Sequence, residues 1–145
     1  MARVLAIDYG QKRTGLAVTD PLQLIASGLE TVETNKLLDY LSKYITSEDV
    51  TTIVVGEPTH ADGSATHIEK NIQELISKIS KNYPNVVIKR QDERYTSVEA
   101  KRVILESGVK KMKRRDKSLI DKVSAAIILQ QYMEAHVWNN NSSLY

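Results

Sequence analysis

Three acidic residues that are far apart in the chain stand where divalent-metal chemistry could use them. Asp8 ends one apolar segment, Glu93 follows another that begins at Val86, and Asp121 is expected in the first turn of a C-terminal helix. In α/β sheets, the carboxyl ends of the strands form the crevice where ligands bind. Carboxylates gathered there repel one another, and Mg²⁺ is a natural partner because it prefers hard oxygen ligands. Two such ions about 4 Å apart would activate a water and stabilise the leaving oxygen of a phosphodiester.

Each of these carboxylates also has a purely structural interpretation. A strand-ending residue such as Asp8 often only starts a turn, and Glu93 could pair with Arg90 or Arg94 at the surface. Asp121 could satisfy backbone donors and the helix dipole without any metal. Only convergence of the three side chains would make a site, and sequence periodicity does not establish convergence.

A second candidate feature is a basic run between the last two expected helices. Six of the eight residues at 110–117 are basic: Lys110, Lys111, Lys113, Arg114, Arg115 and Lys117. With Lys12 and Arg13 at the tip of an expected hairpin, this run would give a track for a nucleic-acid backbone, with steeply salt-dependent binding. It could equally be a solvated connector. The charge asymmetry favours a polyanion partner, since residues 1–72 carry −4 and residues 73–145 carry +6.

The elements that must position these residues alternate along the chain. Apolar runs and alternating segments predict strands at 3–7, 16–19, 24–32 (with a bulge or bend at Ser27–Gly28), 52–56 and from 86 onward. Helical spacing and capping-box pairs (Thr96 with Glu99, Ser118 with Asp121) predict helices at 35–45, 68–82, 96–106 and 118–137. The order is three strands, helix, strand, helix, strand and two helices, which is an α/β pattern.

Composition sets the broad class of the protein. With 145 residues, 41% of them hydrophobic, the chain is expected to form a single domain over 1–138 followed by a flexible tail at 139–145. The absence of cysteine excludes disulfides, thiolate zinc sites and thiol nucleophiles. No apolar run approaches the 18 residues of a membrane helix, and no secretory signal is evident. We therefore expect a soluble cytoplasmic protein with no membrane partner.

Four ordered motifs resemble those of the YqgF family. The first is AIDYGQKRTGLAVTD at residues 6–20, and the others are VG at 55–56 followed by DGS at 62–64, DERYTS at 92–97 and IDKVSAAIILQ at 120–130. Together they span nearly the whole chain. Members of this family are described as pre-16S rRNA nucleases or Holliday-junction resolvases with a ribonuclease H-like fold.

The resemblance implies both a fold and a site. The fold would be a five-stranded mixed sheet, its second strand antiparallel, with helices on both faces. Asp8, Glu93 and Asp121 would be the catalytic carboxylates that bind Mg²⁺ or Mn²⁺. The chain departs from the family where Glu57 replaces an apolar residue between a glycine and a proline. Glu57 could be a fourth metal ligand or could point to solvent, and solvent is slightly favoured.

The leading functional hypothesis is a metal-dependent nuclease that processes the 5′ end of precursor 16S rRNA. The first alternative is a Holliday-junction resolvase acting on branched DNA, and the second is an RNA-binding ribosome-maturation factor without catalysis. An actin-like ATPase or sugar kinase ranks last, because those enzymes close two such domains around a nucleotide. Precursor rRNA or branched DNA is the expected partner, together with ribosomal particles, and the chain could be a monomer or a homodimer.

Overall fold

A single mixed sheet organises the protein. The computed structural model describes residues 2–60, 62–93, 100, 102–103 and 117–138. The strands are β1 (Arg3–Asp8), β2 (Arg13–Thr19), β3 (Ala26–Glu33), β4 (Val50–Glu57) and β5 (Val87–Asp92). Their order is β3-β2-β1-β4-β5, with β1 antiparallel to β2, β2 antiparallel to β3, and β1, β4 and β5 parallel. The expectation of a five-stranded mixed sheet with an antiparallel second strand is confirmed.

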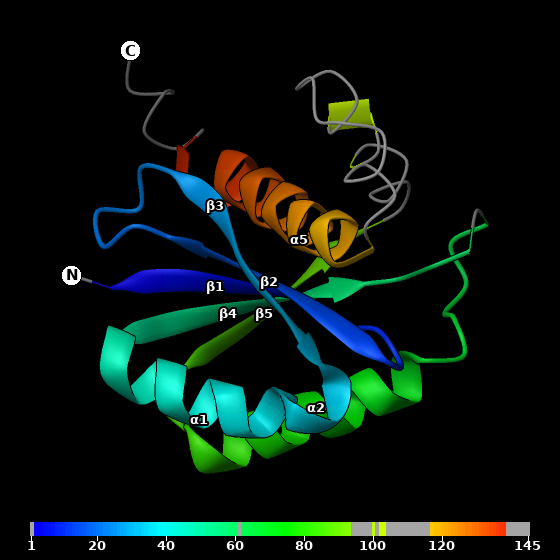
Figure 1. Cartoon of the computed structure of the whole chain (residues 1–145), viewed down its shortest axis with the longest axis horizontal. Coiled ribbons are helices and arrows are strands. Elements are labelled where there is room, and N and C mark those ends of the chain that lie inside the picture. Colours follow the sequence, from blue (N-terminus) through cyan, green and yellow to red (C-terminus); the bar gives the residue numbers. More distant parts are fainter. Residues whose placement is uncertain (1, 61, 94–99, 101, 104–116, 139–145) are drawn as a thin grey trace.

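Helices cover both faces of this sheet. They are α1 (Leu37–Glu48), after a 3₁₀ turn at Thr34–Lys36, α2 (Glu69–Asn82) and α5 (Lys117–Met133), which continues as a π-helical turn at Glu134–Trp138. Figure 1 shows α1 and α2 on one face and α5 on the other. Among the described residues, no helix is both long and apolar enough to cross a membrane.

Alternate residues of β1 serve two separate apolar cores. Leu5 and Ile7 pack with α1 and α2, whereas Val4 and Ala6 pack with α5. Successive side chains of a strand point to opposite faces, so an uninterrupted apolar run is needed where both faces are covered. The same parity places Asp8, two residues beyond Ala6, on the α5 face. The fold therefore directs this acid toward the C-terminal helix.

The third strand begins two residues later than the sequence predicts. The Asp20 carboxylate accepts the backbone N–H groups of Leu24 and Ile25, both at 2.8 Å. These donors are thereby used in a side-chain-capped loop, and β3 begins only at Ala26. The predicted irregularity near Gly28 is confirmed, because the β2–β3 register shifts between Leu16 and Ala17.

Two predicted segments fall largely outside the described residues. In the helix predicted at 96–106, Ala100, Arg102 and Val103 are described and are helical. The tail at 139–145 lies outside the described ranges, so the division into a domain at 1–138 and a flexible tail stays a prediction.

Candidate active site

Asp8 lies between two strand positions that carry no side chain. It ends β1 and is paired across the antiparallel ladder with Gly15 of β2. On the other side, Ile7 pairs with Val55 of β4, which places Gly56 beside Asp8. The two glycines leave open space on both flanks of the carboxylate, and other acids fill that space.

Glu93 reaches this space from the end of the neighbouring strand. It follows β5 directly, and its backbone N–H donates to the carbonyl oxygen of Glu57 at 3.3 Å. A Cβ added at Gly56 would collide with Glu93 Oε2 and would come within 3.1 Å of Ile128 Cδ1 of α5. The absence of a side chain at Gly56 therefore lets the carboxyl of Glu93 lie over β4, beneath α5.

Asp121 reaches the same edge from α5. A Cβ at Gly15 would collide with the backbone carbonyl of Asp121 and approach its Cα to 3.2 Å. Asp121 is the fifth residue of α5, so the prediction that it lies in the first helical turn is wrong. The helix already includes Lys117, and the Asp121 carboxylate instead extends to the sheet edge, where Oδ2 accepts a hydrogen bond from Arg13 Nε at 3.0 Å.

Electrostatic interactions connect Asp8 with each of the other two acids. Burial raises the pKa of Asp8 to about 6; a hydrogen bond with Glu93 opposes this rise, and the charge of Asp121 adds to it. Burial, followed by the charge of Asp8 and the hydrogen bond with it, raises the pKa of Glu93 to about 9. Desolvation and like charges both disfavour ionisation, and a bound cation would reverse both effects.

The three acids offer carboxylate oxygens, the donor type that a hard divalent cation prefers. Glu93 Oε2 is buried and has no hydrogen-bond partner among the described residues. A buried oxygen without a partner is costly unless another group satisfies it. Within the described ranges, no group of three His, Cys, Asp or Glu side chains could hold an ion as it stands. Asp8 and Glu93 are hydrogen-bonded to each other, while Asp121 is paired with Arg13.

Glu57 and Arg90 support the edge of β4. Arg90 forms two hydrogen bonds with the Glu69 carboxylate, both at 2.9 Å, and also donates to the backbone oxygens of Val55 and Gly56 at 3.2 and 2.9 Å. Glu57 lies 3.9 Å from Arg90, and its side chain is 47% exposed. Exposure favours the solvent interpretation of Glu57 over that of a metal ligand.

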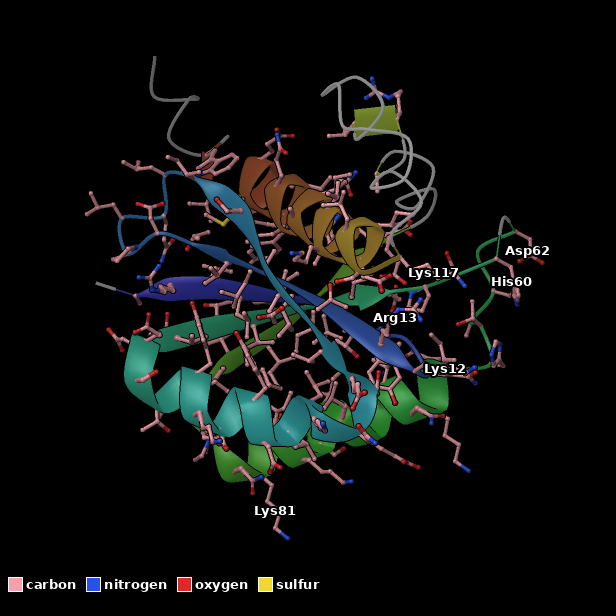
Figure 2. The ribbon with its side chains drawn as sticks, in the orientation of Figure 1. Lys12, Arg13, His60, Asp62, Lys81 and Lys117 are labelled. Carbon is pink, nitrogen blue, oxygen red and sulfur yellow. The ribbon has the colours of Figure 1, made fainter. Side chains whose placement is uncertain are left out.

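Three of the predicted basic residues lie at the same end of the molecule as the acids. Lys12, Arg13 and Lys117 gather there, with the loop that carries His60 and Asp62 nearby, whereas Lys81 lies well away (Figure 2). Lys12 and Lys117 are exposed. The remaining predicted basic residues, Lys110, Lys111, Lys113, Arg114 and Arg115, lie outside the described residues.

The contributions of Gly15, Gly56 and Arg90 were missed by the sequence analysis. The predicted strands leave Gly15 just outside residues 16–19 and place Gly56 last in 52–56, although glycine within a strand often marks a close approach of another group. Arg90 was considered as a partner of Glu93, but its hydrogen bonds go to Glu69 and to two carbonyls. A glycine at each strand position flanking an acid was the signal available.

Comparison with known proteins gives the family. The family model of RuvX, described as Holliday junction resolvase, matches residues 2–135. The chain belongs to this family. A relative from Bacteroides thetaiotaomicron is 47% identical over 135 residues, covering 93% of this chain and 98% of the relative. One from Porphyromonas gingivalis is 50% identical over 134 residues, covering 92% and 97%. Both carry the name "Putative pre-16S rRNA nuclease".

A solved structure shares the fold. Thermus thermophilus RuvC, determined in complex with a Holliday junction substrate, superposes with a TM-score of 0.58 at 17% identity, covering 94% of this chain and 98% of that one. The ribonuclease H-like fold implied by the sequence resemblance is confirmed. The family description and the relatives' names agree on a nuclease, which is a hydrolase, as the sequence analysis expected.

Proposed function

We propose that this protein is a metal-dependent nuclease that hydrolyses phosphodiester bonds of structured RNA, with the 5′ end of precursor 16S rRNA as its substrate. The observation that carries the proposal is that Asp8, at one edge of the sheet, is hydrogen-bonded to Glu93 and has its pKa raised by the charge of Asp121. The names of the relatives support the choice of substrate. Action on ribosomal particles in the cytoplasm follows from that choice.

In this proposal, Asp8, Glu93 and Asp121 hold Mg²⁺ or Mn²⁺. Two bound ions would supply an activated water and stabilise the leaving oxygen. Oε2 of Glu93, which has no hydrogen-bond partner within the described part of the chain, is the best-placed ligand atom, because it is already desolvated and held over Gly56. The burial that raises the pKa of Asp8 and Glu93 also excludes bulk water, which strengthens every charge interaction within the site.

The basic residues at the same end would bind the nucleic-acid backbone. Lys12 and Lys117 are exposed beside the acids and free to contact phosphates on the surface. The basic residues at 110–115 would extend this track. Phosphate contacts position a backbone without reading its sequence. Selectivity for a processing site would therefore come from the shape of the RNA.

The deciding experiment compares wild-type protein with Asp8→Asn on a precursor 16S rRNA fragment. Wild type is expected to cleave when Mg²⁺ or Mn²⁺ is present and to stop when a chelator is added. Asp8→Asn should lose cleavage and keep its circular dichroism spectrum. Equal activity in the two proteins would defeat the proposal. RNA binding that ignores chelator, without turnover, would instead favour a maturation factor that only binds.

The family description favours a second candidate, resolution of Holliday junctions. The RuvC likeness adds the fold alone. A four-way junction has two equivalent strands to cut, so resolution requires a dimer with two-fold symmetry. Symmetric paired nicking of a synthetic junction by a dimeric species would support this candidate. A monomer that cuts the rRNA fragment and leaves the junction intact would exclude it.

A further inference from the structure

Arg13 contacts one of the proposed metal ligands and also belongs to the basic residues proposed to bind phosphates. Its Nε donates to Asp121 Oδ2 at 3.0 Å, and its side chain is 40% exposed, against 24% for that of Asp121. One side of the guanidinium therefore contacts a proposed metal ligand while another side faces solvent. Lys12 and Lys117 lie at the same end (Figure 2).

The backbone that carries Arg13 is fixed, so a change of partner would involve only the side chain. The N–H of Thr34 donates to the carbonyl of Lys12 at 2.9 Å, and the Thr34 hydroxyl donates to the carbonyl of Gly10 at 2.6 Å. The Thr14 hydroxyl then serves as donor to Thr34 Oγ1 at 2.9 Å, because the only hydroxyl proton of Thr34 is already used. The backbone of Arg13 lies opposite that of Glu33 in the register of β2 and β3.

Electrostatics make Asp121 and a nucleic-acid phosphate alternative partners of Arg13. Without a metal, the guanidinium provides a counter-charge for Asp121 close to Asp8, whose pKa Asp121 raises. A divalent ion held by Asp121 would bring two positive charges to the atom that Arg13 now contacts. Repulsion between the ion and the guanidinium would disfavour having both in contact with Asp121. The released fork of guanidinium donors matches a phosphate group, which it can bind through two parallel hydrogen bonds.

We propose that Arg13 is an exchangeable counter-ion: it pairs with Asp121 in the metal-free protein and passes to a nucleic-acid phosphate when a divalent ion takes Asp121. This proposal rests on the metal-dependent nuclease function above. It links the two binding events, because the metal frees a phosphate-binding group that the metal-free protein keeps occupied. Nucleic acid and metal would then each favour binding of the other.

The first test measures Mn²⁺ binding by calorimetry for wild type, Arg13→Gln and Lys12→Gln. The two variants lose the same charge from adjacent residues, and of these two residues it is Arg13 that forms the ion pair with Asp121. Arg13→Gln should bind Mn²⁺ about fivefold more tightly than Lys12→Gln, the size expected for losing a partly exposed charge-assisted hydrogen bond. Equal affinities in the two variants would overturn the exchange while leaving the nuclease proposal intact. No Mn²⁺ binding by wild type would overturn both proposals.

The second test follows the salt dependence of binding to an uncleavable RNA, with chelator and with Mn²⁺. Each phosphate contact on a single strand adds about 0.7 to the slope of log affinity against log salt. Arg13→Gln should match the wild-type slope in chelator and be shallower by about 0.7 in Mn²⁺. Lys12→Gln should be shallower than wild type in both conditions. A slope deficit for Arg13→Gln that is the same with and without metal would overturn the proposal.

Discussion

Asp8 and Gly15 face each other across the β1–β2 ladder, and the backbone of Asp121 fills the space that a side chain on Gly15 would need. This pairing brings the acid of a strand and the acid of a helix to one point of the sheet. Gly56 performs the same role for Glu93 on the other side of Asp8. The two glycines therefore shape the site as much as the acids do.

Substitution of Gly15 by alanine should separate α5 from the sheet. The new Cβ would collide with the backbone of Asp121, which a rotamer change does not relieve. We expect a loss of about 2 kcal/mol in the free energy of unfolding, measured with urea, together with loss of activity. Gly28→Ala is the matched control, since its Cβ would meet Lys122 Cβ of the same helix at 3.3 Å, a contact that a small shift relieves. Equal stability of the two variants would contradict this account.

Substitution of Gly56 by alanine should expel the Glu93 carboxyl from its place over β4. The added Cβ would overlap Glu93 Oε2, so Mn²⁺ affinity and stability should both fall. A double-mutant cycle with Glu93→Ala separates this clash from the tight contact with Ile128, which lies 3.1 Å from the added Cβ. The cost of Gly56→Ala should shrink by about 1 kcal/mol when Glu93 is already absent. Strict additivity of the two substitutions would show that the glycine serves another purpose.

The raised pKa values predict an unusual pH dependence of stability. The folded protein retains protons on Asp8 and Glu93, with pKa values of about 6 and about 9, that the unfolded chain releases near 3.8 and 4.5. The free energy of unfolding of the metal-free protein should therefore fall as the pH rises from about 4 to about 9, by about 1.4 kcal/mol per pH unit for each proton retained.

Glu93→Gln should abolish this decline above about pH 6, because the proton with the highest pKa is gone. Saturating Mn²⁺ should also remove the decline, since the ion favours the carboxylate form. Urea titrations from pH 5 to pH 9 measure the free energy of unfolding of metal-free wild type, of Glu93→Gln and of wild type with saturating Mn²⁺. A metal-free wild type that gains stability over this interval would show that the two acids are ionised in the folded protein.

Arg90 should contribute strongly to stability through the edge of β4. Arg90→Met would remove a two-fold hydrogen-bonded ion pair with Glu69 and leave the carbonyls of Val55 and Gly56 without this donor. We expect a loss of about 2–3 kcal/mol in the free energy of unfolding. Lys89→Met, an exposed position in the same strand, should change stability by less than about 0.5 kcal/mol.

The order of the elements and the acids that end or follow them can be predicted from local patterns of residues. Uninterrupted apolar runs encode β1 and β4 as central strands, and a short apolar run beginning at Val86 marks the start of β5. Such patterns are local, so Asp8 could be placed at the end of β1 and Glu93 after β5 without coordinates. The start of β3 was misplaced because the Asp20 side chain captures two backbone donors, a competition that hydrophobic pattern does not register. The same limit applies to Asp121, whose helix already includes Lys117, the residue before the predicted cap at Ser118.

The tertiary structure decided how the acids meet and what accompanies them. Arg13 and Asp121 are 108 positions apart, and their ion pair exists only because α5 packs closely on β2 at Gly15. Periodicity reports which face of an element is apolar, whereas a contact between distant residues depends on how closely two packed elements approach. That distance is short because Gly15 and Gly56 have no side chain. The importance of these two glycines becomes visible only when the helix and the strands are placed together.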